Sequence, residues 1–167
     1  MIANRVNNIK PSFTLEMATK AAEMRSEGID VINFSVGEPD FNTPKHICDA
    51  AKNAIDNGYT KYTAGPGMIE ARQAICKKLE RDNGLYYNPD NVLISNGEKQ
   101  SLFTACQALF NPGDRVIVFT PYWVSFPEFV RMADAEPVLI NTLANNSYEP
   151  DFDALNKKPK KNIKGVI

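Results

Sequence analysis

Residues 92–119 read VLISNGEKQSLFTACQALFNPGDRVIVF, and this stretch decides the fold class. Val92–Ile94 is a short apolar run that predicts a strand, and the apolar residues after Gly97 recur at helical spacing, which predicts a helix over 98–110. A turn with proline and glycine follows, and Arg115–Phe119 predicts a second strand. A strand, a helix and a strand in this order predict a parallel sheet covered by helices.

The same periodicities predict further elements on both sides of this stretch. On the carboxyl side, helices and strands continue to alternate: a helix over 124–133, a strand over 137–140, a short helix over 151–156 and a strand at 165–167. On the amino side, helices are predicted that are each followed by a glycine: 14–27, 44–57 and 68–83. No helix follows the final strand, so we expect this chain to be the amino-terminal part of a longer protein.

The composition is that of an ordinary globular protein, with 167 residues, 43% of them hydrophobic and 23% charged. The 19 basic residues face 20 acidic ones, so no nucleic-acid partner is expected, and the basic run at 157–161 is interpreted as a solvated loop. No apolar run reaches membrane-spanning length, and the N-terminus lacks the pattern of a secretory signal. We therefore expect a cytoplasmic protein with no membrane partner.

The cysteines and the single histidine give no sign of a metal site. Cys48, Cys76 and Cys106 are far apart in the sequence, and none has CxxC spacing. They are expected to be reduced, buried thiols rather than a disulfide framework. His46 is expected at the surface, in the first turn of a helix.

A first candidate binding loop, Ser95–Lys99, follows a predicted strand and opens a predicted helix. Ligands of parallel α/β sheets bind beyond the carboxyl ends of the strands, where loops meet helix N-termini. The backbone N–H groups of Gly97, Glu98 and Lys99 would point at one spot, which suits a phosphate. A plain connector is the alternative on the pattern alone, because the loop has neither a dinucleotide-binding nor a Walker fingerprint.

A second candidate loop, Thr120–Phe126, carries the only tryptophan of the chain, Trp123, beside Tyr122. Two aromatic rings behind a proline suit a stacking face for a flat heterocycle, and a hydrophobic plug over the end of the sheet is the alternative. Gly37 indicates either a close approach of the backbone to a ligand or an ordinary turn. Tyr62 stands in a third loop and has no assigned role from the pattern alone.

Segments of the chain resemble the class I aminotransferases, in the order and at about the spacing of that family. The segments that carry the resemblance are VGEPDFNTP (36–44), KYTAGPG (61–67), NGEKQ (96–100), NPGD (111–114) and PYWVSFPEFVR (121–131). The match covers essentially the whole chain and is closest to the prokaryotic aspartate aminotransferase branch.

The resemblance implies an α/β architecture, the type I fold of pyridoxal-phosphate-dependent transferases. This chain would supply an amino-terminal arm, helices and the first part of the large-domain sheet, truncated at its end. Residues 1–40 would form the arm and the start of the small domain. Residues 41–167 would form the first part of the large domain, which binds the cofactor. The full-length protein would be a homodimer.

The resemblance also implies which residues bind pyridoxal 5'-phosphate. In the family, the matching loop binds the cofactor phosphate through backbone amides, which assigns Gly97, Glu98 and Lys99 to that role. Trp123 matches the aromatic residue packed on the cofactor ring. Tyr62 matches a tyrosine that reaches the cofactor of the other subunit. Glu98 replaces a second family glycine, and a positive φ at this residue would be costly.

An amino acid and a 2-oxo acid are the small-molecule substrates that the resemblance implies. Gly37 matches the glycine whose backbone meets the substrate carboxylate, and Trp123 belongs to the same substrate site. Lys99 matches a lysine that helps recognise an acidic side chain, with a lysine that points to solvent as the alternative. The full-length protein is expected to transfer an amino group from aspartate or glutamate, and transamination of aromatic or other amino acids is the alternative within the class.

No catalytic residue of the family is expected in this chain. The family lysine that forms a Schiff base with pyridoxal phosphate stands in a motif that no lysine here matches. Residues 1–167 alone are therefore expected to be inactive. Outside the enzyme class, the alternatives are a non-catalytic module that binds a phosphate ligand and a scaffold with an exposed sheet edge.

Overall fold

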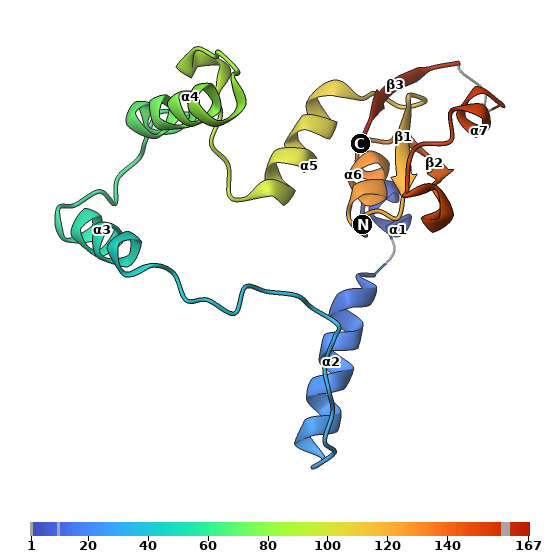
Figure 1. Ribbon diagram of the computed structural model, residues 1–167, viewed down its shortest axis with the longest axis horizontal. Helices are drawn as coiled ribbons and strands as arrows, with labels where there is room; N and C mark the ends of the chain where they lie inside the picture. The colour runs from blue at the N-terminus through green and yellow to red at the C-terminus, as the bar shows by residue number, and fades with distance from the viewer. Residues whose placement is uncertain (1, 10, 158–160) are drawn as a thin grey trace. The chain divides into compact units, whose positions relative to one another are not determined.

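A computed structural model describes residues 2–9, 11–157 and 161–167. The chain divides into two units by its internal contacts. Figure 1 labels the α-helices and strands named below. The sheet unit comprises Met1–Ile32 and Asn96–Ile167, and the helical unit comprises Asn33–Ser95. The domain boundary expected at residue 40 concerns the longer protein, and it stays a prediction.

Parallel strands form the sheet in the order β2-β1-β3: β1 (Arg115–Thr120), β2 (Glu136–Asn141) and β3 (Ile163–Val166). The central strand β1 pairs with β2 over its whole length, from Arg115 opposite Glu136 to Thr120 opposite Asn141. On its other side β1 pairs with β3, and the register shifts after Arg115. This parallel sheet with helices between its strands confirms the predicted fold class.

The sheet unit contains helices before and between the strands: α1 (Asn4–Asn7), α2 (Phe13–Ser26), α5 (Glu98–Leu109), α6 (Phe126–Met132), η2 (Ala144–Asn146) and α7 (Phe152–Lys157). α1 contacts α6, next to an ion pair between Arg5 Nη1 and Asp134 Oδ2 at 3.5 Å. α5 also contacts α6. Ala21 is the one buried residue of α2, all of which the structure describes.

Both faces of the sheet are covered, because successive side chains of a strand point to opposite faces. On one face, Val116 of β1 packs against Val130 of α6. On the other face, Ile117 packs with apolar residues of β2, and Leu155 of α7 packs against them. Strands buried on both faces read as continuous apolar runs, which is why β1 was predictable from its sequence.

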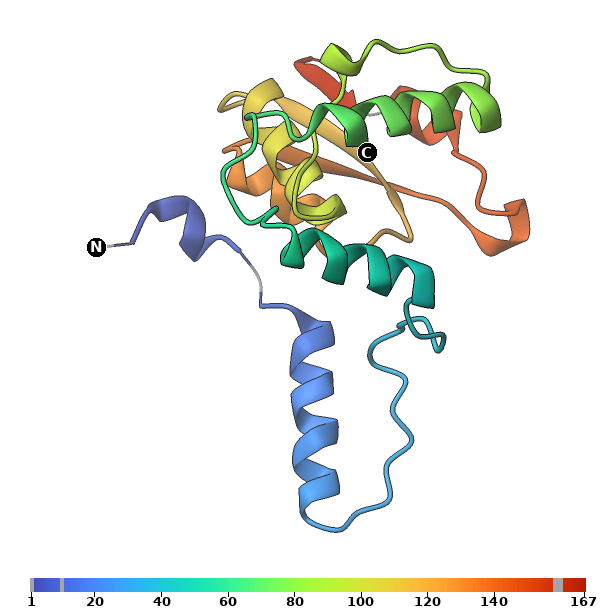
Figure 2. The same ribbon diagram turned by 90° about the vertical axis from the view of Figure 1, so that its left-hand side faces the viewer.

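The helical unit consists of α3 (Lys45–Asp56), α4 (Ile69–Asn83) and the short η1 (Pro89–Asn91), joined by extended segments (Figure 2). Arg72 on α4 ties this helix to η1. Its Nη1 donates to the Pro89 carbonyl at 2.9 Å and lies 3.4 Å from Asp90 Oδ1. Arg72 is the only buried residue of the unit, which the structure describes completely.

The predicted strand at Val92–Ile94 is wrong. The segment is extended, but it pairs with no strand in the described part of the chain. Instead, the Ile94 N–H donates to the Pro66 carbonyl at 3.0 Å, and a Cβ on Gly67 would meet the Ile94 side chain at 3.0 Å. A strand is defined by its ladder to a neighbour, and a local apolar pattern does not supply that neighbour.

The other predicted elements are confirmed, with ends displaced by a few residues. α6 begins at Phe126 instead of 124, which places Pro127 in the first turn, where its missing N–H costs nothing. β3 begins at Ile163, two residues before the predicted start. Helix and strand ends depend on neighbouring contacts as well as on local pattern, and they are therefore the least predictable feature.

The prediction of three buried thiols is right for one cysteine and wrong for two. Cys106 on α5 is buried, whereas Cys48 and Cys76 in the helical unit are partly exposed. All three are free. The difference follows from their surroundings, because α5 belongs to the unit that contains the sheet and the helical unit has no apolar core of its own.

Predictions about the surface have separate outcomes. His46 is exposed, as expected. Residues 158–160, the middle of the basic run that was interpreted as a solvated loop, lie outside the described residues. Within the ranges that are described, no helix is both long enough and apolar enough to cross a membrane.

Candidate active site

The N-terminus of α5 forms one side of the candidate site. Gly97 precedes the helix with φ 83° and ψ 171°, a conformation open to glycine and to hardly any other residue. A Cβ at this position would meet nothing within 4 Å, so the backbone conformation, not crowding, requires the glycine. Glu98 is the first helical residue. The positive φ therefore falls on Gly97, and the acidic residue that replaces the second family glycine carries no such strain.

No side chain caps the start of α5. The first amide groups of an α-helix have no acceptor within the helix, and a polar side chain before the helix often supplies one. Gly97 has no side chain to do so, which leaves the amides of Glu98 and Lys99 to solvent or to a ligand. The helix dipole makes a negatively charged ligand favourable there.

Trp123 forms a second wall of the site. It follows β1 in the loop that leads to α6, where its carbonyl accepts a hydrogen bond from the Phe126 N–H at 2.9 Å. The side chain of Trp123 is half exposed. Lys99 Nζ lies 5.2 Å from the centre of the Trp123 ring, within the range of a cation–π contact. This contact joins the two loops that were predicted separately.

The carboxyl ends of β1 and β2 are tied together where the Trp123 loop begins. The Thr142 N–H donates to Thr120 Oγ1 at 3.3 Å, and Thr142 Oγ1 donates to the Thr120 carbonyl. Thr120 is the last residue of β1, three residues before Trp123. The Trp123 loop therefore starts at Thr120, whose carbonyl and side-chain hydroxyl both accept hydrogen bonds from Thr142.

A cavity of about 560 Å³ lies between the start of α5 and the Trp123 loop. Its lining residues come from α5, from the loop before it and from the chain around the start of α6: Asn96, Gly97, Glu98, Lys99, Leu102, Trp123, Phe126 and Phe129. The structure thus brings together four of the predicted site residues, Gly97, Glu98, Lys99 and Trp123. The cavity has backbone amides at one end and an aromatic ring on its wall, which fits a flat ligand that carries a phosphate.

Part of the apolar lining was missed by the sequence prediction. Leu102 and Phe129 were interpreted only as residues of predicted helices, whereas Phe126 ends the second candidate loop. Phe129 also packs edge-to-face against Phe103, with ring centres 6.5 Å apart. Leu102 lies little more than one helical turn after Gly97, and this position near a candidate binding loop is a signal that could have pointed to it. No local signal distinguishes Phe129 from an ordinary core residue.

Gln100 was also missed as part of the site. Its side-chain Oε1 accepts a hydrogen bond from the Asn96 N–H at 2.6 Å. The bond spans the loop from the residue before Gly97 to the first turn of α5. In the common capping box the third helical residue bonds the N–H of the residue just before the helix, whereas here the bond reaches one residue further, to Asn96.

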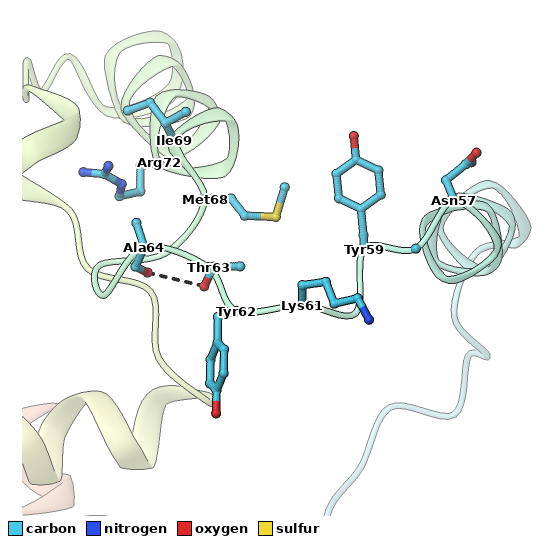
Figure 3. Close-up of a pocket in the computed structure, with 10 residues that line it drawn as sticks. Asn57, Tyr59, Lys61, Tyr62, Thr63, Ala64, Met68, Ile69 and Arg72 are labelled. Atoms are coloured by element: carbon cyan, nitrogen blue, oxygen red, sulfur yellow. Dashed lines mark hydrogen bonds between the residues drawn. The ribbon is translucent and has the colours of Figure 1, made fainter.

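Tyr62 and Gly37 belong to the helical unit, and their site roles stay predictions. Tyr62 is fully exposed, and its ring projects away from Met68 and Tyr59 (Figure 3). It lines a second cavity of about 550 Å³ beside the start of α4. Gly37 is exposed, and neither a positive φ nor a neighbour within 4 Å of an added Cβ requires a glycine there.

Comparison with known proteins finds aminotransferases by both sequence and fold. The family model for aminotransferase class I and II matches residues 29–167. An aspartate aminotransferase of Bacillus sp. (strain YM-2) is 44% identical over 167 residues, which is 100% of this chain. An aspartate/prephenate aminotransferase of Nitrosomonas europaea is 46% identical over 156 residues, or 93% of this chain.

A solved structure of aspartate aminotransferase from Thermus thermophilus with maleate superposes with a TM-score of 0.94 at 40% identity, and the match covers 99% of this chain. The chain spans less than half the length of these proteins: 43% of the Bacillus relative, 39% of the Nitrosomonas relative and 44% of the solved Thermus chain.

Proposed function

This chain belongs to the class I and II aminotransferases, and we propose that the whole protein exchanges an amino group between aspartate or glutamate and a 2-oxo acid. Enzymes of this class depend on pyridoxal 5'-phosphate. Aspartate is the proposed substrate because aspartate aminotransferases recur among relatives that match nearly the whole chain. Prephenate is also compatible as the 2-oxo acid, since the name of the Nitrosomonas relative includes it, and other 2-oxo acids are compatible as well.

The observation that carries the proposal is the pairing of a helix start without a side-chain cap and an aromatic wall in one cavity. In the proposed arrangement, the amides of Gly97, Glu98 and Lys99 hold the phosphate of pyridoxal 5'-phosphate. The Trp123 ring stacks on the cofactor ring. The cofactor supplies an electron-withdrawing ring that stabilises negative charge at the substrate α-carbon. The helix start and the Trp123 ring would orient the cofactor, and the ring would keep water from one of its faces.

Three further residues have proposed roles beyond the cofactor. Lys99 would attract the side-chain carboxylate of an acidic substrate, which its position over the Trp123 ring supports. Gly37 would meet the substrate α-carboxylate through its backbone. Tyr62 would reach the cofactor of a second subunit in a homodimer, and its full exposure supports a role outside its own unit.

We also propose a cytoplasmic protein whose residues 1–167 do not transaminate alone. The three free cysteines support a reducing compartment. The inactivity rests on the expected lack of a Schiff-base lysine motif in this chain. An assay of the purified chain with aspartate and a 2-oxo acid should show no turnover above the rate of free cofactor. Turnover that is abolished by replacing one lysine would overturn this part of the proposal.

Binding of the cofactor by this chain tests the proposed site directly. Trp123 is the only tryptophan, so its fluorescence reports on this cavity alone. We expect saturable quenching by pyridoxal 5'-phosphate and binding weaker by on the order of tenfold for pyridoxal, which lacks the phosphate. Inorganic phosphate should compete. Borohydride reduction and peptide mapping would then show whether any lysine is modified.

The outcome separates the proposal from its alternatives. Equal quenching by the two compounds would show that the helix start does not hold the phosphate. Phosphate-dependent binding without a specific lysine adduct is the expected result. The same binding in a longer, complete protein that has no transaminase activity would instead identify a module that binds a phosphate ligand without catalysis.

A further inference from the structure

We propose that Gln100 is a positioning residue that holds the phosphate-binding loop in its binding conformation before the ligand arrives. The inference rests on the proposed function, because it assigns a role within the same site. Gln100 Oε1 accepts the Asn96 N–H at 2.6 Å and thereby closes the loop that contains Gly97. Gln100 would touch neither the cofactor nor the substrate.

The need for such a bond follows from Gly97. Glycine has more backbone freedom than any other residue, and ordering it costs the most conformational entropy. Gly97 is also held in a conformation, φ 83° and ψ 171°, that directs the chain into α5. The bond joins Asn96, which precedes this glycine, to Gln100, which follows it. It therefore restricts the one residue of the loop that would otherwise move most freely.

The position of Gln100 explains why it can act without occupying the site. A helix start is usually closed by a polar side chain on the residue before the helix, and that side chain uses up amides of the first turn. Here the residue is a glycine, and the structure gives no side-chain cap to α5. Gln100 folds back instead on the Asn96 N–H. The loop is held while the amides of Glu98 and Lys99 stay available to an anion.

The chemistry of the side chain matters as well as its length. The accepting oxygen of Gln100 belongs to a neutral amide, so it holds the loop without placing a negative charge beside a bound phosphate. A glutamate in this position would make the same bond and would also repel the ligand. One acidic and one basic residue, Glu98 and Lys99, already line the cavity, so a further acidic group would change the charge balance of the site.

The test compares two changes at Gln100 with a matched change on the same helix. Gln100→Met keeps the length of the side chain and its helix propensity but removes the acceptor. Gln107→Met makes the same change at an exposed residue of α5 for which the structure gives no side-chain hydrogen bond. Gln100→Glu keeps the acceptor and adds a charge that can be titrated.

Two measurements on the purified chain are needed. Amide hydrogen exchange of Asn96 by NMR reports the bond itself, without any ligand. Fluorescence titration with pyridoxal 5'-phosphate and with pyridoxal reports its consequence for binding. For Gln100→Met we expect faster exchange at Asn96 and about fivefold weaker binding of pyridoxal 5'-phosphate, with pyridoxal binding unchanged. Gln107→Met should change none of these.

Gln100→Glu provides a pH-dependent measurement, which would not change if Gln100 had only a structural role. Relative to the unmodified chain at the same pH, its binding of pyridoxal 5'-phosphate should be weakest near pH 8. The deficit should shrink only toward pH 4, below the ordinary glutamate pKa of about 4.3, where this side chain becomes mostly neutral. A deficit that is independent of pH would contradict the proposed closeness of this side chain to the phosphate.

The remaining outcomes are distinct for the two proposals. If the unmodified chain binds pyridoxal 5'-phosphate and Gln100→Met binds it equally well, the inference about Gln100 is wrong and the proposed site stands. If the unmodified chain shows no preference for pyridoxal 5'-phosphate over pyridoxal, the proposed site fails and the role of Gln100 fails with it, even where Asn96 is protected from exchange.

Discussion

The sheet unit and the helical unit bury their apolar residues to very different extents. In the sheet unit, Val116, Val118 and Val130 are 0% exposed. In the helical unit, the only buried residue is Arg72, and large side chains such as Phe34 (92%) are almost fully exposed. The difference shows that burial here comes from a sheet with helices on its faces. Helices and extended segments without a sheet stay open.

α3 shows the same lesson within one element. Its apolar residues recur at helical spacing, yet Ile47 and Ile55 remain 49% and 63% exposed. Local pattern is enough to form the helix and to place these residues on one side of it. The helical unit contains no surface that covers that side. Large exposed apolar areas of this kind mark places where another surface packs.

The largest expected effect comes from removing the same side-chain atoms in each unit. Ile140→Ala empties a site in β2 that is 1% exposed, and it should lower the free energy of unfolding of the sheet unit by about 3 kcal/mol. Ile55→Ala, on the 63% exposed residue of α3, should cost well under about 1 kcal/mol. Urea denaturation followed by circular dichroism and Trp123 fluorescence measures both. Equal losses would show that α3 is buried in solution.

A second prediction concerns the one buried group of the helical unit. Arg72→Met removes the hydrogen bond to the Pro89 carbonyl and the contact with Asp90, and should destabilise the link between α4 and η1 by roughly 2 kcal/mol. Hydrogen exchange over residues 69–91 should accelerate accordingly. Arg81→Met, on an exposed side chain of the same helix whose ion pair is with the adjacent Asp82, is the control and should leave exchange between α4 and η1 unchanged. If both variants exchange alike, the Arg72 contacts do not hold this unit together.

An effect of intermediate size is expected when the reactivity of the cysteine thiols is compared between the sheet unit and the helical unit. Burial raises the pKa of the Cys106 thiol, so less thiolate is present at any given pH. Alkylation at pH 8 should therefore be slower at Cys106 than at the partly exposed Cys48 and Cys76, by about tenfold. The alkylation rate of Cys106 should reach half of its maximum at a pH above the ordinary pKa of a cysteine thiol, because burial raises the pKa of this group. Mass spectrometry of the alkylated peptides measures the rates, and in denaturant all three cysteines should react alike.

The smallest expected effect is that of Lys99 on Trp123. Removing the ammonium group with Lys99→Met should change the Trp123 emission spectrum but alter stability by less than about 1 kcal/mol, because cation–π contacts at exposed positions are weak. Lys52→Met, on an exposed lysine of α3, is the matched control and should leave the emission unchanged. An unaltered spectrum in Lys99→Met would mean that the lysine does not rest on the ring in solution.

The candidate site was predictable in part because its chemistry is encoded locally. Gly97 with a helix after it, and Trp123 after a buried strand, are patterns of a few adjacent residues. That the two loops share one cavity depends on the contact between α5 and α6, which no local pattern states. The Gln100 bond was not predictable for a related reason, since a glutamine in a first helical turn also commonly points to solvent.

The amino-acid sequence by itself determined which segments are helical or extended, where the turns fall, and the family to which the chain belongs. Periodicity and glycine placement act over a few residues and survive in any surroundings. Tertiary structure alone decided that Arg115–Thr120 lies at the centre of the sheet, and that Val92–Ile94 pairs with no strand in the part of the chain that the structure describes. It likewise decided which apolar residues are buried. A strand needs a partner and a buried side chain needs a covering surface, and both come from parts of the chain distant in sequence.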